Sequence, residues 1–131
     1  ISKSKKPEFG FSPNIFIKFD NYIFDNKSDG FTAPGHHYDV IEKMPSNFSI
    51  LAENDVSIQA IASKDSNIVC TQYHPELPYD FIGKLMLYWK KNYLNEMLEN
   101  EFMDLINQLK ILESKNSYQR ELELTNWISN L

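Results

Sequence analysis

Short apolar runs separated by polar turns fill the first part of the chain, up to about residue 76. Residues 15–19 and residues 22–24 are rich in the β-branched and aromatic side chains that favour strands. The polar pair Asp20-Asn21 lies between these runs, and a longer polar turn follows at residues 25–30. The pattern therefore predicts one or two β-hairpins in this region.

Two further segments have the pattern of paired strands. Residues 56–62 carry apolar side chains at every second position, as expected for a strand with one buried face. Residues 67–72 contain the apolar run Ile68-Val69-Cys70, which predicts a more buried strand. A short polar turn separates the two segments, so we expect both strands to pair in one sheet.

Helical spacing replaces the strand pattern beyond Pro78, and no proline follows that residue. We expect a helix to begin just after Pro78 and to pack onto the sheet through one apolar face. That face consists of Phe81, Leu85, Tyr88 and Trp89. A second stripe, spaced at three and four residues, consists of Leu94, Leu98, Phe102, Leu105, Leu109 and Leu112.

This leucine-rich stripe has two interpretations. Packing against the chain's own sheet is the ordinary one. The other is docking of residues 95–131 on another domain or on a second copy, and the second copy would make the C-terminal helices a homo-oligomer interface. The polar residues 114–117 predict a break before a last helical segment, whose stripe is Leu124, Trp127 or Ile128, and Leu131. We expect residues 1–94 to form an α/β portion and residues 95–131 a helical extension.

Composition limits the classes of function. The chain has 131 residues, about one domain, and no apolar run approaches the roughly 18 to 20 residues of a membrane span. The net charge of -5 and the dispersed lysines argue against nucleic acid as a direct partner. One cysteine cannot form an internal disulfide, and no secretory leader is evident, so the expected location is the cytoplasm.

The tetrapeptide Tyr73-His74-Pro75-Glu76, after the predicted strand 67–72, is the strongest candidate for chemistry. A histidine becomes an effective general base or acid when a carboxylate holds its tautomer and stabilises the imidazolium ion. Residues at the carboxyl ends of strands in open α/β sheets commonly face a ligand crevice. The alternative is an ordinary surface histidine, His74, followed by an acid, Glu76, near the N-terminus of the next helix.

A metal site is not expected. The chain has three histidines, two of them adjacent, and no second cysteine, which is a weak set of zinc ligands. The sequence also offers no reason to expect an organic cofactor.

The order of several segments resembles the C-terminal half of class I glutamine amidotransferases. The resemblance covers about residues 7–89 and is closest in character to the amidotransferase domain of GMP synthetase and its stand-alone relatives. The segments that carry it are His37-Tyr38-Asp39-Val40, Met44-Pro45, Leu51-Ala52-Glu53-Asn54, Gln59-Ala60-Ile61 and Gln72-Tyr73-His74-Pro75-Glu76.

The resemblance implies a three-layer, flavodoxin-like α/β fold and a Cys-His-Glu triad that hydrolyses the side-chain amide of glutamine. His74 matches the family histidine, and Glu76 matches the carboxylate that orients it. His36, His37 and Tyr38 lie where relatives hold the α-carboxylate and α-amino groups of glutamine. Because many relatives have Ser-His-Gly there, the backbone is expected to contribute more than these side chains, and His36 and His37 could equally be structural loop histidines.

The chain departs from the family pattern in its nucleophile. Relatives carry a Gly-x-Cys-x-Gly turn and a glycine-rich oxyanion loop upstream of the segments matched here, and neither is present. Cys70, on a predicted buried strand, is expected to be a core residue, because it lacks the exposure and helix N-terminal field that activate a thiol. The first residue is Ile1 rather than Met, so we expect a missing N-terminal half to supply the cysteine and this chain alone to be inactive.

Three functions remain open from the sequence. The first is an amidotransferase or glutaminase acting on glutamine, whose ammonia is consumed by a synthetase domain or subunit. The second is a γ-glutamyl hydrolase, with which the pair His36-His37 is compatible, although Tyr38-Asp39-Val40 and Met44-Pro45 favour the amidotransferases. The third is a non-catalytic homologue that serves as an interaction module.

Overall fold

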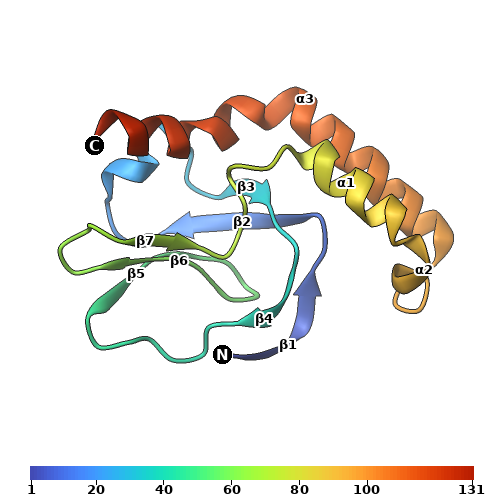
Figure 1. Cartoon of the computed structure of the whole chain (residues 1–131), viewed down its shortest axis with the longest axis horizontal. Coiled ribbons are helices and arrows are strands. Elements are labelled where there is room, and N and C mark those ends of the chain that lie inside the picture. The colour runs from blue at the N-terminus through green and yellow to red at the C-terminus, as the bar shows by residue number, and fades with distance from the viewer.

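The computed structural model describes residues 1–131, apart from the side chain of Lys5. Figure 1 shows a sheet with the long helix α3 and the shorter α1 along one side. The elements, in chain order, are β1 (Ser2–Glu8), β2 (Phe11–Ile17), the short 3-10 helix η1 (Tyr22–Phe24), β3 (Phe31–Pro34), β4 (His37–Val40), β5 (Phe48–Glu53), β6 (Ile58–Ser63), β7 (Val69–Thr71), α1 (Tyr79–Tyr88), α2 (Lys90–Tyr93) and α3 (Glu99–Ser129).

Five strands form the main sheet in the order β3-β2-β5-β6-β7, and every neighbouring pair is antiparallel. The strands β1 and β4 form a separate antiparallel pair. The predicted pairing of residues 56–62 with residues 67–72 is confirmed, because β6 pairs with β7. The expectation of one buried face for the first of these strands is wrong, since four consecutive residues of β6, Gln59 to Ala62, are buried.

The predicted strand at residues 22–24 is wrong, because these residues form η1. The side chain of Asn21 accepts a hydrogen bond from the amide of Ile23 at 3.1 Å and caps this turn. Such a cap offers the backbone a local alternative to a strand ladder. The buried side chains of Ile23 and Phe24 then join the core of the sheet.

The core has two parts. Around the sheet it contains Ile15, Ile23, Phe24, Phe31, Ala33, Leu51, Ala52, Ala60, Ala62 and Tyr73. Between the helices it contains Tyr79, Ile82, Met86, Tyr93, Phe102, Ile106 and Leu109. Gly10 lies between β1 and β2 with a φ of +83°, and a side chain there would meet Leu109, so the turn requires glycine.

The helix α1 begins at Tyr79, as predicted, but its buried face is not the expected one. Phe81, Leu85, Tyr88 and Trp89 are exposed. Tyr79, Ile82, Gly83 and Met86 are buried instead, and they belong to the core between α1 and α3 rather than to the sheet. Because the helix is apolar around much of its circumference, spacing alone could not identify the buried side.

The helix α3 continues through residues 114–117, so the predicted break is wrong. These residues include no proline or glycine, and polar residues alone lower helix propensity only slightly. Figure 1 shows instead that the helix changes direction along its length. Leu94 and Leu98 precede the helix and are exposed, as are Leu124, Trp127, Ile128 and Leu131 of the predicted last stripe.

The two halves of α3 contact different parts of the chain. Phe102, Ile106 and Leu109 pack against α1. Farther along, Asn126 donates hydrogen bonds to the carbonyls of Ile23 and Asp25, at 3.0 and 2.9 Å. The helix α3 therefore packs on the chain's own elements. The division into residues 1–94 and 95–131 and the homo-oligomer interface stay predictions.

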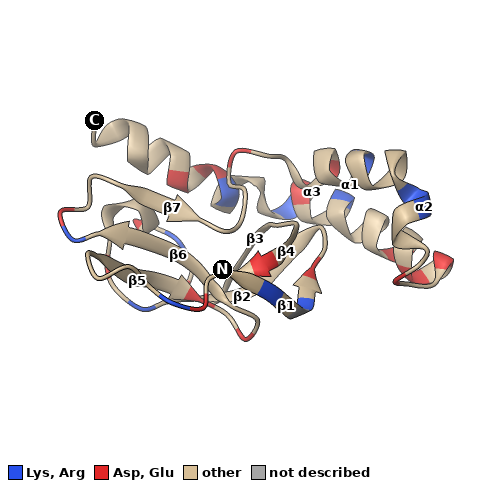
Figure 2. Ribbon diagram, turned by 60° about the horizontal axis from the view of Figure 1, so that its bottom comes forward, with Lys and Arg blue, Asp and Glu red and all other residues tan. Residues whose placement is uncertain are grey.

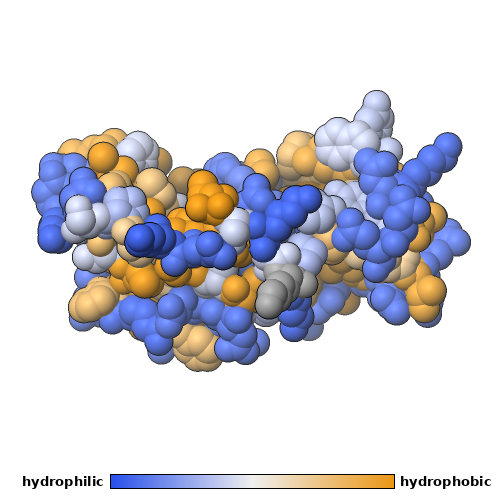
Figure 3. All heavy atoms as spheres, turned by 90° about the horizontal axis from the view of Figure 1, so that it is seen from below, coloured by the Kyte–Doolittle hydropathy of each residue, from blue (hydrophilic) through white to orange (hydrophobic). Residues whose placement is uncertain are grey.

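The surface has mixed character. Figure 2 shows basic and acidic residues interspersed along the ribbon rather than gathered in one block. Figure 3 views the molecule from the side opposite α3, where apolar side chains are grouped between polar ones. Among the described residues, no helix combines the length and the apolar character needed to cross a membrane.

Candidate active site

The loop that carries His74 and Glu76 connects β7 to α1. The amide of His74 donates to the carbonyl of Pro34 at 2.7 Å, which fixes the loop against the end of β3. The amide of Leu77 then donates to the carbonyl of His74 at 3.1 Å, and this bond closes a turn around Pro75 and Glu76. The backbone at His74 is therefore held at both its N–H and its C=O.

His74 and Glu76 are in direct contact. His74 Nδ1 lies 2.8 Å from Glu76 Oε1, and their side chains are 42% and 52% exposed. Because an ionised carboxylate only accepts hydrogen bonds, this contact assigns the proton to Nδ1. Among the described residues Nε2 has no hydrogen-bond partner, so the second nitrogen is free to take up a proton.

Glu76 does not cap the following helix. The amide of Tyr79, the first residue of α1, donates to Glu113 Oε2 at 2.9 Å, so the carboxylate at this helix N-terminus comes from α3. This contact weakens the alternative of Glu76 as a local helix acid. Sequence spacing could not point to Glu113, because it lies 34 residues beyond Tyr79.

His37 belongs to a buried polar cluster with Glu8, Asn54 and Gln59. His37 Nε2 lies 2.9 Å from Glu8 Oε1, and its Nδ1 lies 2.9 Å from the carbonyl of Asp39. Asn54 and Gln59 donate to the same carboxylate at 2.9 and 2.6 Å. Both ring nitrogens of His37 are therefore engaged within the protein.

The cluster shifts both of its titratable groups toward their charged forms. Burial alone lowers the pKa of His37, but its hydrogen bonds to Glu8 and to the Asp39 carbonyl outweigh burial and raise that pKa above its usual value. Burial alone raises the pKa of Glu8, but the hydrogen bonds from His37, Asn54 and Gln59 outweigh burial and lower it. Both shifts therefore favour an ion pair between the two buried side chains.

His36 lies among aromatic rings. Its ring centroid is 5.3 Å from that of Phe9 and 5.6 Å from that of Tyr93, and a 3.0 Å hydrogen bond joins its Nε2 to the Tyr93 hydroxyl. Burial, together with the nearby His37 and His74, lowers the pKa of His36. This histidine is therefore kept neutral.

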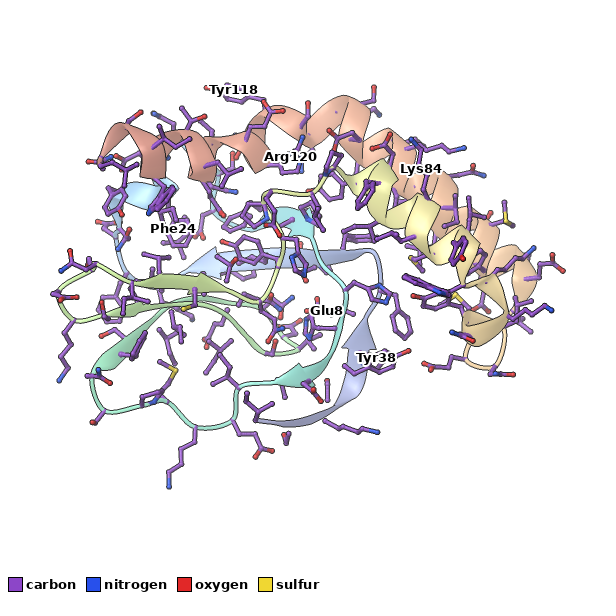
Figure 4. The ribbon with its side chains drawn as sticks, viewed as in Figure 1. Glu8, Phe24, Tyr38, Lys84, Tyr118 and Arg120 are labelled. Atoms are coloured by element: carbon purple, nitrogen blue, oxygen red, sulfur yellow. The ribbon has the colours of Figure 1, made fainter. Side chains whose placement is uncertain are left out.

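Tyr38 is exposed, and its hydroxyl donates to Glu96 at 3.2 Å. Figure 4 shows Tyr38 directed toward the end of the molecule that carries α2, with Glu8 on the inner side of β1. The three predicted substrate residues thus have side chains that bond to the chain's own groups. The role of these three residues in binding glutamine stays a prediction. The backbone just before them, at Pro34, is hydrogen-bonded to the amide of His74.

Cys70 is exposed, so the prediction of a core cysteine is wrong. The strand β7 has only three residues and forms the edge of the sheet, and its flanking residues Val69 and Thr71 are half-buried while Cys70 points outward. Cys70 lies within a strand rather than at a helix N-terminus, so it lacks that means of activating a thiol.

A hollow of about 220 Å³ lies beside Glu76, between the end of α3 and β7. Most ligand pockets measure roughly 300 to 1,000 Å³, so this hollow is small for a substrate site. Its walls are Ile23, Val69, Thr71, Pro75, Glu76, Glu123, Leu124 and Trp127. Within the described part of the chain, no group of three or more His, Cys, Asp or Glu could hold a metal ion.

Three residues of α3 near the loop were not singled out from the sequence. Arg120 Nη1 donates to the carbonyl of Pro75 at 3.2 Å, and Glu123 Oε1 accepts from the Tyr73 hydroxyl at 2.7 Å. Glu113 is the third. All three lie far from the loop in sequence, so no local pattern could have identified them.

Residues 3–90 match the family model described as glutamine amidotransferase class-I. The chain is 31% identical over 88 residues to a subunit of the glutamine-hydrolysing GMP synthase of Methanococcus maripaludis, covering 66% of this chain and 46% of that protein. It is 32% identical over 102 residues to the glutamine-hydrolysing GMP synthase of Borrelia garinii, covering 77% of this chain and 19% of that protein.

Two crystal structures are similar in fold. One, from Thermotoga maritima, is a glutamine amidotransferase with a TM-score of 0.76 and 16% identity, and the match covers 94% of this chain and 52% of that one. The other, from Thermoplasma acidophilum and described as a GMP synthase subunit, has a TM-score of 0.54 and 27% identity over 70% of this chain and 50% of that one. The first likeness confirms the predicted fold class, and it extends into α3.

Proposed function

The chain belongs to the class I glutamine amidotransferase family, and we propose that it forms the C-terminal half of a domain that hydrolyses the side-chain amide of glutamine. The chain spans about half the length of the Methanococcus protein and about a fifth of the Borrelia protein. The nucleophilic cysteine and the oxyanion donors then come from a segment outside these 131 residues. In this proposal His74 and Glu76 are the other two members of a Cys-His-Glu triad.

One observation carries the proposal. The 2.8 Å contact between His74 Nδ1 and Glu76 Oε1 lies on an exposed loop, inside the matched residues 3–90, and no described side chain bonds to Nε2. A base of this kind needs an orienting group on one nitrogen and access to the reacting group on the other. The exposed site also leaves room for a nucleophile from another segment.

The proposed chemistry uses both ring nitrogens of His74, with Nδ1 held by Glu76 and Nε2 as the base. His74 Nε2 takes the proton of the cysteine thiol, the thiolate attacks the amide carbon of glutamine, and the same proton passes to the leaving ammonia. A glutamyl thioester remains. Water then attacks the thioester with His74 as base, which releases glutamate and restores the thiol. Glu76 stabilises the imidazolium ion that forms in each step.

Substrate recognition is assigned to the backbone of residues 36–38, which comprise His36 and the first two residues of β4. Their side chains are occupied by Tyr93, Glu8 and Glu96. The carbonyl of Pro34, at the end of β3, accepts a hydrogen bond from the amide of His74, so the catalytic loop is fixed beside the start of this segment. Peptide groups beside His74 can therefore hold the α-carboxylate and α-amino groups of glutamine.

The acceptor of ammonia is proposed from the relatives. Two of them are named GMP synthase, and one of these is a separate subunit whereas the other is a longer protein. A synthetase domain or subunit that consumes the released ammonia is the corresponding partner for this chain, and GMP synthesis is one such reaction.

The test uses the complete protein that contains this chain. Glutamine and a γ-glutamyl peptide are supplied separately, and ammonia and free glutamate are measured. We expect glutamine to yield both products in equal amounts and the peptide to yield neither above background. Absence of ammonia from glutamine, with or without an acceptor substrate, would contradict the proposal, and hydrolysis of the peptide alone would favour a γ-glutamyl hydrolase.

A further inference from the structure

Polar groups from one face of α3 hold the loop of His74 on both of its sides. Glu123 accepts from the Tyr73 hydroxyl at 2.7 Å, and Arg120 donates to the carbonyl of Pro75 at 3.2 Å. Tyr73 and Pro75 are the two neighbours of His74 in the chain. Positions 120 and 123 are three residues apart, which in a helix puts both side chains on the same face.

Figure 4 shows this arrangement. Arg120 lies on the side of α3 that faces the loop, whereas Tyr118 lies on the opposite side. The guanidinium group of Arg120 is also bonded to Glu113, at 2.8 Å, and Glu113 in turn accepts the amide of Tyr79. The loop is therefore tied to α3 before His74, between His74 and Glu76, and at the start of α1.

The anchoring groups are charged and almost completely buried. Arg120 is 6% exposed and Glu123 is 1% exposed. Glu123 forms an ion pair with Lys27 at 2.9 Å, and the ammonium group of Lys27 lies 3.8 Å from the centre of the Phe31 ring. Burial raises the pKa of Glu123 and lowers that of Lys27, so withdrawing these groups from water is unfavourable.

A cluster of buried ionisable groups contributes little net stability to a fold. Apolar side chains of similar volume often stabilise a core at least as well as a buried ion pair, so the arrangement calls for a role in specifying geometry. His74 and Glu76 are half-exposed, and a contact between polar side chains at the surface is a weak restraint on those side chains. The precision of their contact must then come from the backbone that carries them.

We propose that Arg120 and Glu123 are positioning residues for the His74–Glu76 pair, acting through the Pro75 carbonyl and the Tyr73 hydroxyl. The inference rests on the proposed function. It gives the C-terminal half of α3 a part in catalysis through the Tyr73 hydroxyl and the Pro75 carbonyl, which flank His74 in the chain.

The decisive variants change one anchor at a time in the complete protein. Tyr73→Phe removes only the hydroxyl and leaves the pair of Lys27 with Glu123 intact. Arg120→Met removes the donor to Pro75 together with the bond to Glu113, and it retains a long side chain. Tyr118→Phe and Lys115→Met are the matched controls, because both residues are exposed on α3. Arg120→Lys restores a donor at the same position.

We expect each anchor variant to lower kcat for glutamine hydrolysis about tenfold to a hundredfold and to leave KM within about twofold, because small displacements of a reacting group have effects of this size. Arg120→Lys should recover part of the loss, and both controls should match the wild type. The assays are run well below the unfolding temperature of each variant. Unchanged kcat in both anchor variants, while His74→Ala is inactive, would overturn the inference.

A second readout does not depend on turnover. Nitrogen-15 NMR of His74 reports which ring nitrogen carries the proton, and the 2.8 Å contact with Glu76 predicts the Nδ1–H form in the wild type. The anchor variants should show a mixture of both forms, whereas the controls should not. If His74→Ala retains activity, the proposed function fails, and this measurement still decides the positioning role: an unchanged tautomer in both anchor variants would overturn it.

Discussion

The molecule contains two histidine–glutamate pairs with nearly the same contact distance and opposite surroundings. His37 and Glu8 are 2.9 Å apart with side chains 6% and 4% exposed. His74 and Glu76 are 2.8 Å apart with side chains 42% and 52% exposed. A short contact between imidazole and carboxylate is therefore not sufficient to identify a catalytic pair.

The difference lies in what the other groups of each pair do. Both nitrogens of His37 are bonded, and its carboxylate partner also accepts from Asn54 and Gln59. That pair joins β1, β4 and the β5–β6 region into one unit and has no nitrogen left for chemistry. His74 lies on an exposed loop, and its Nε2 has no hydrogen-bond partner in the described part of the chain. We therefore assign stability to the buried pair and propose proton transfer for the exposed one.

The largest expected effect comes from breaking the exposed pair. His74→Ala in the complete protein should reduce kcat for glutamine hydrolysis by about a thousandfold or more, because the substitution removes the general base. The unfolding midpoint should shift little, since the side chain is half-exposed. Ammonia release and thermal unfolding are measured on the same preparation, and retention of more than a tenth of the activity would contradict the assignment.

Breaking the buried pair should have the reverse effect. Glu8→Ala leaves His37 without its partner, and the loss of one member of a buried ion pair typically costs about 3 to 5 kcal/mol. We expect a lower free energy of unfolding in urea, with a normal turnover for the protein that remains folded. Glu42→Ala, at an exposed acidic residue, is the control. Equal stability of the two variants would refute the structural role of Glu8.

The pH dependence of stability sharpens the comparison. The pKa of His37 is raised in the folded protein. The stabilisation that the protonated His37 adds to the free energy of unfolding is therefore complete below about pH 6.5, and it is lost as the pH rises through the folded-state pKa. The pKa of Glu8 is lowered in the folded protein. The stabilisation that the ionised Glu8 adds to the free energy of unfolding is therefore present above about pH 4.5, and it is lost as the pH falls through the folded-state pKa.

The buried pair should therefore stabilise the protein most between about pH 4.5 and pH 6.5. The difference in unfolding free energy between wild type and Glu8→Gln should be greatest in that window and smaller on either side. Urea titrations at a series of pH values measure this difference. A difference that is independent of pH would show that charge has no part in the effect.

The smallest effect is expected at Cys70. Its exposure makes the thiol accessible, but its place within β7 provides no helix N-terminal field. Cys70→Ser should change kcat by less than about twofold, because we assign the nucleophile to another segment. A large loss of activity with intact folding would make Cys70 the nucleophile.

The exposed pair could be predicted from the sequence because its members are two residues apart and follow a strand. The buried pair could not, since Glu8 and His37 are 29 residues apart and meet only when β1 pairs with β4. The exposure of Cys70 depends on β7 being an edge strand, which is a property of the whole sheet. Likewise, the buried face of α1 is selected by α3, a distant element that local spacing cannot reveal.

In the proposed division of roles, proton transfer belongs to the exposed pair alone. The most direct test is the turnover per folded molecule of Glu76→Gln and Glu8→Gln, two substitutions that remove the same charge at nearly constant shape. We predict that Glu76→Gln lowers kcat by about a hundredfold or more, and that Glu8→Gln leaves it within about threefold. Equal kcat values for the two variants, or a larger loss in Glu8→Gln, would contradict the division of roles between the two pairs.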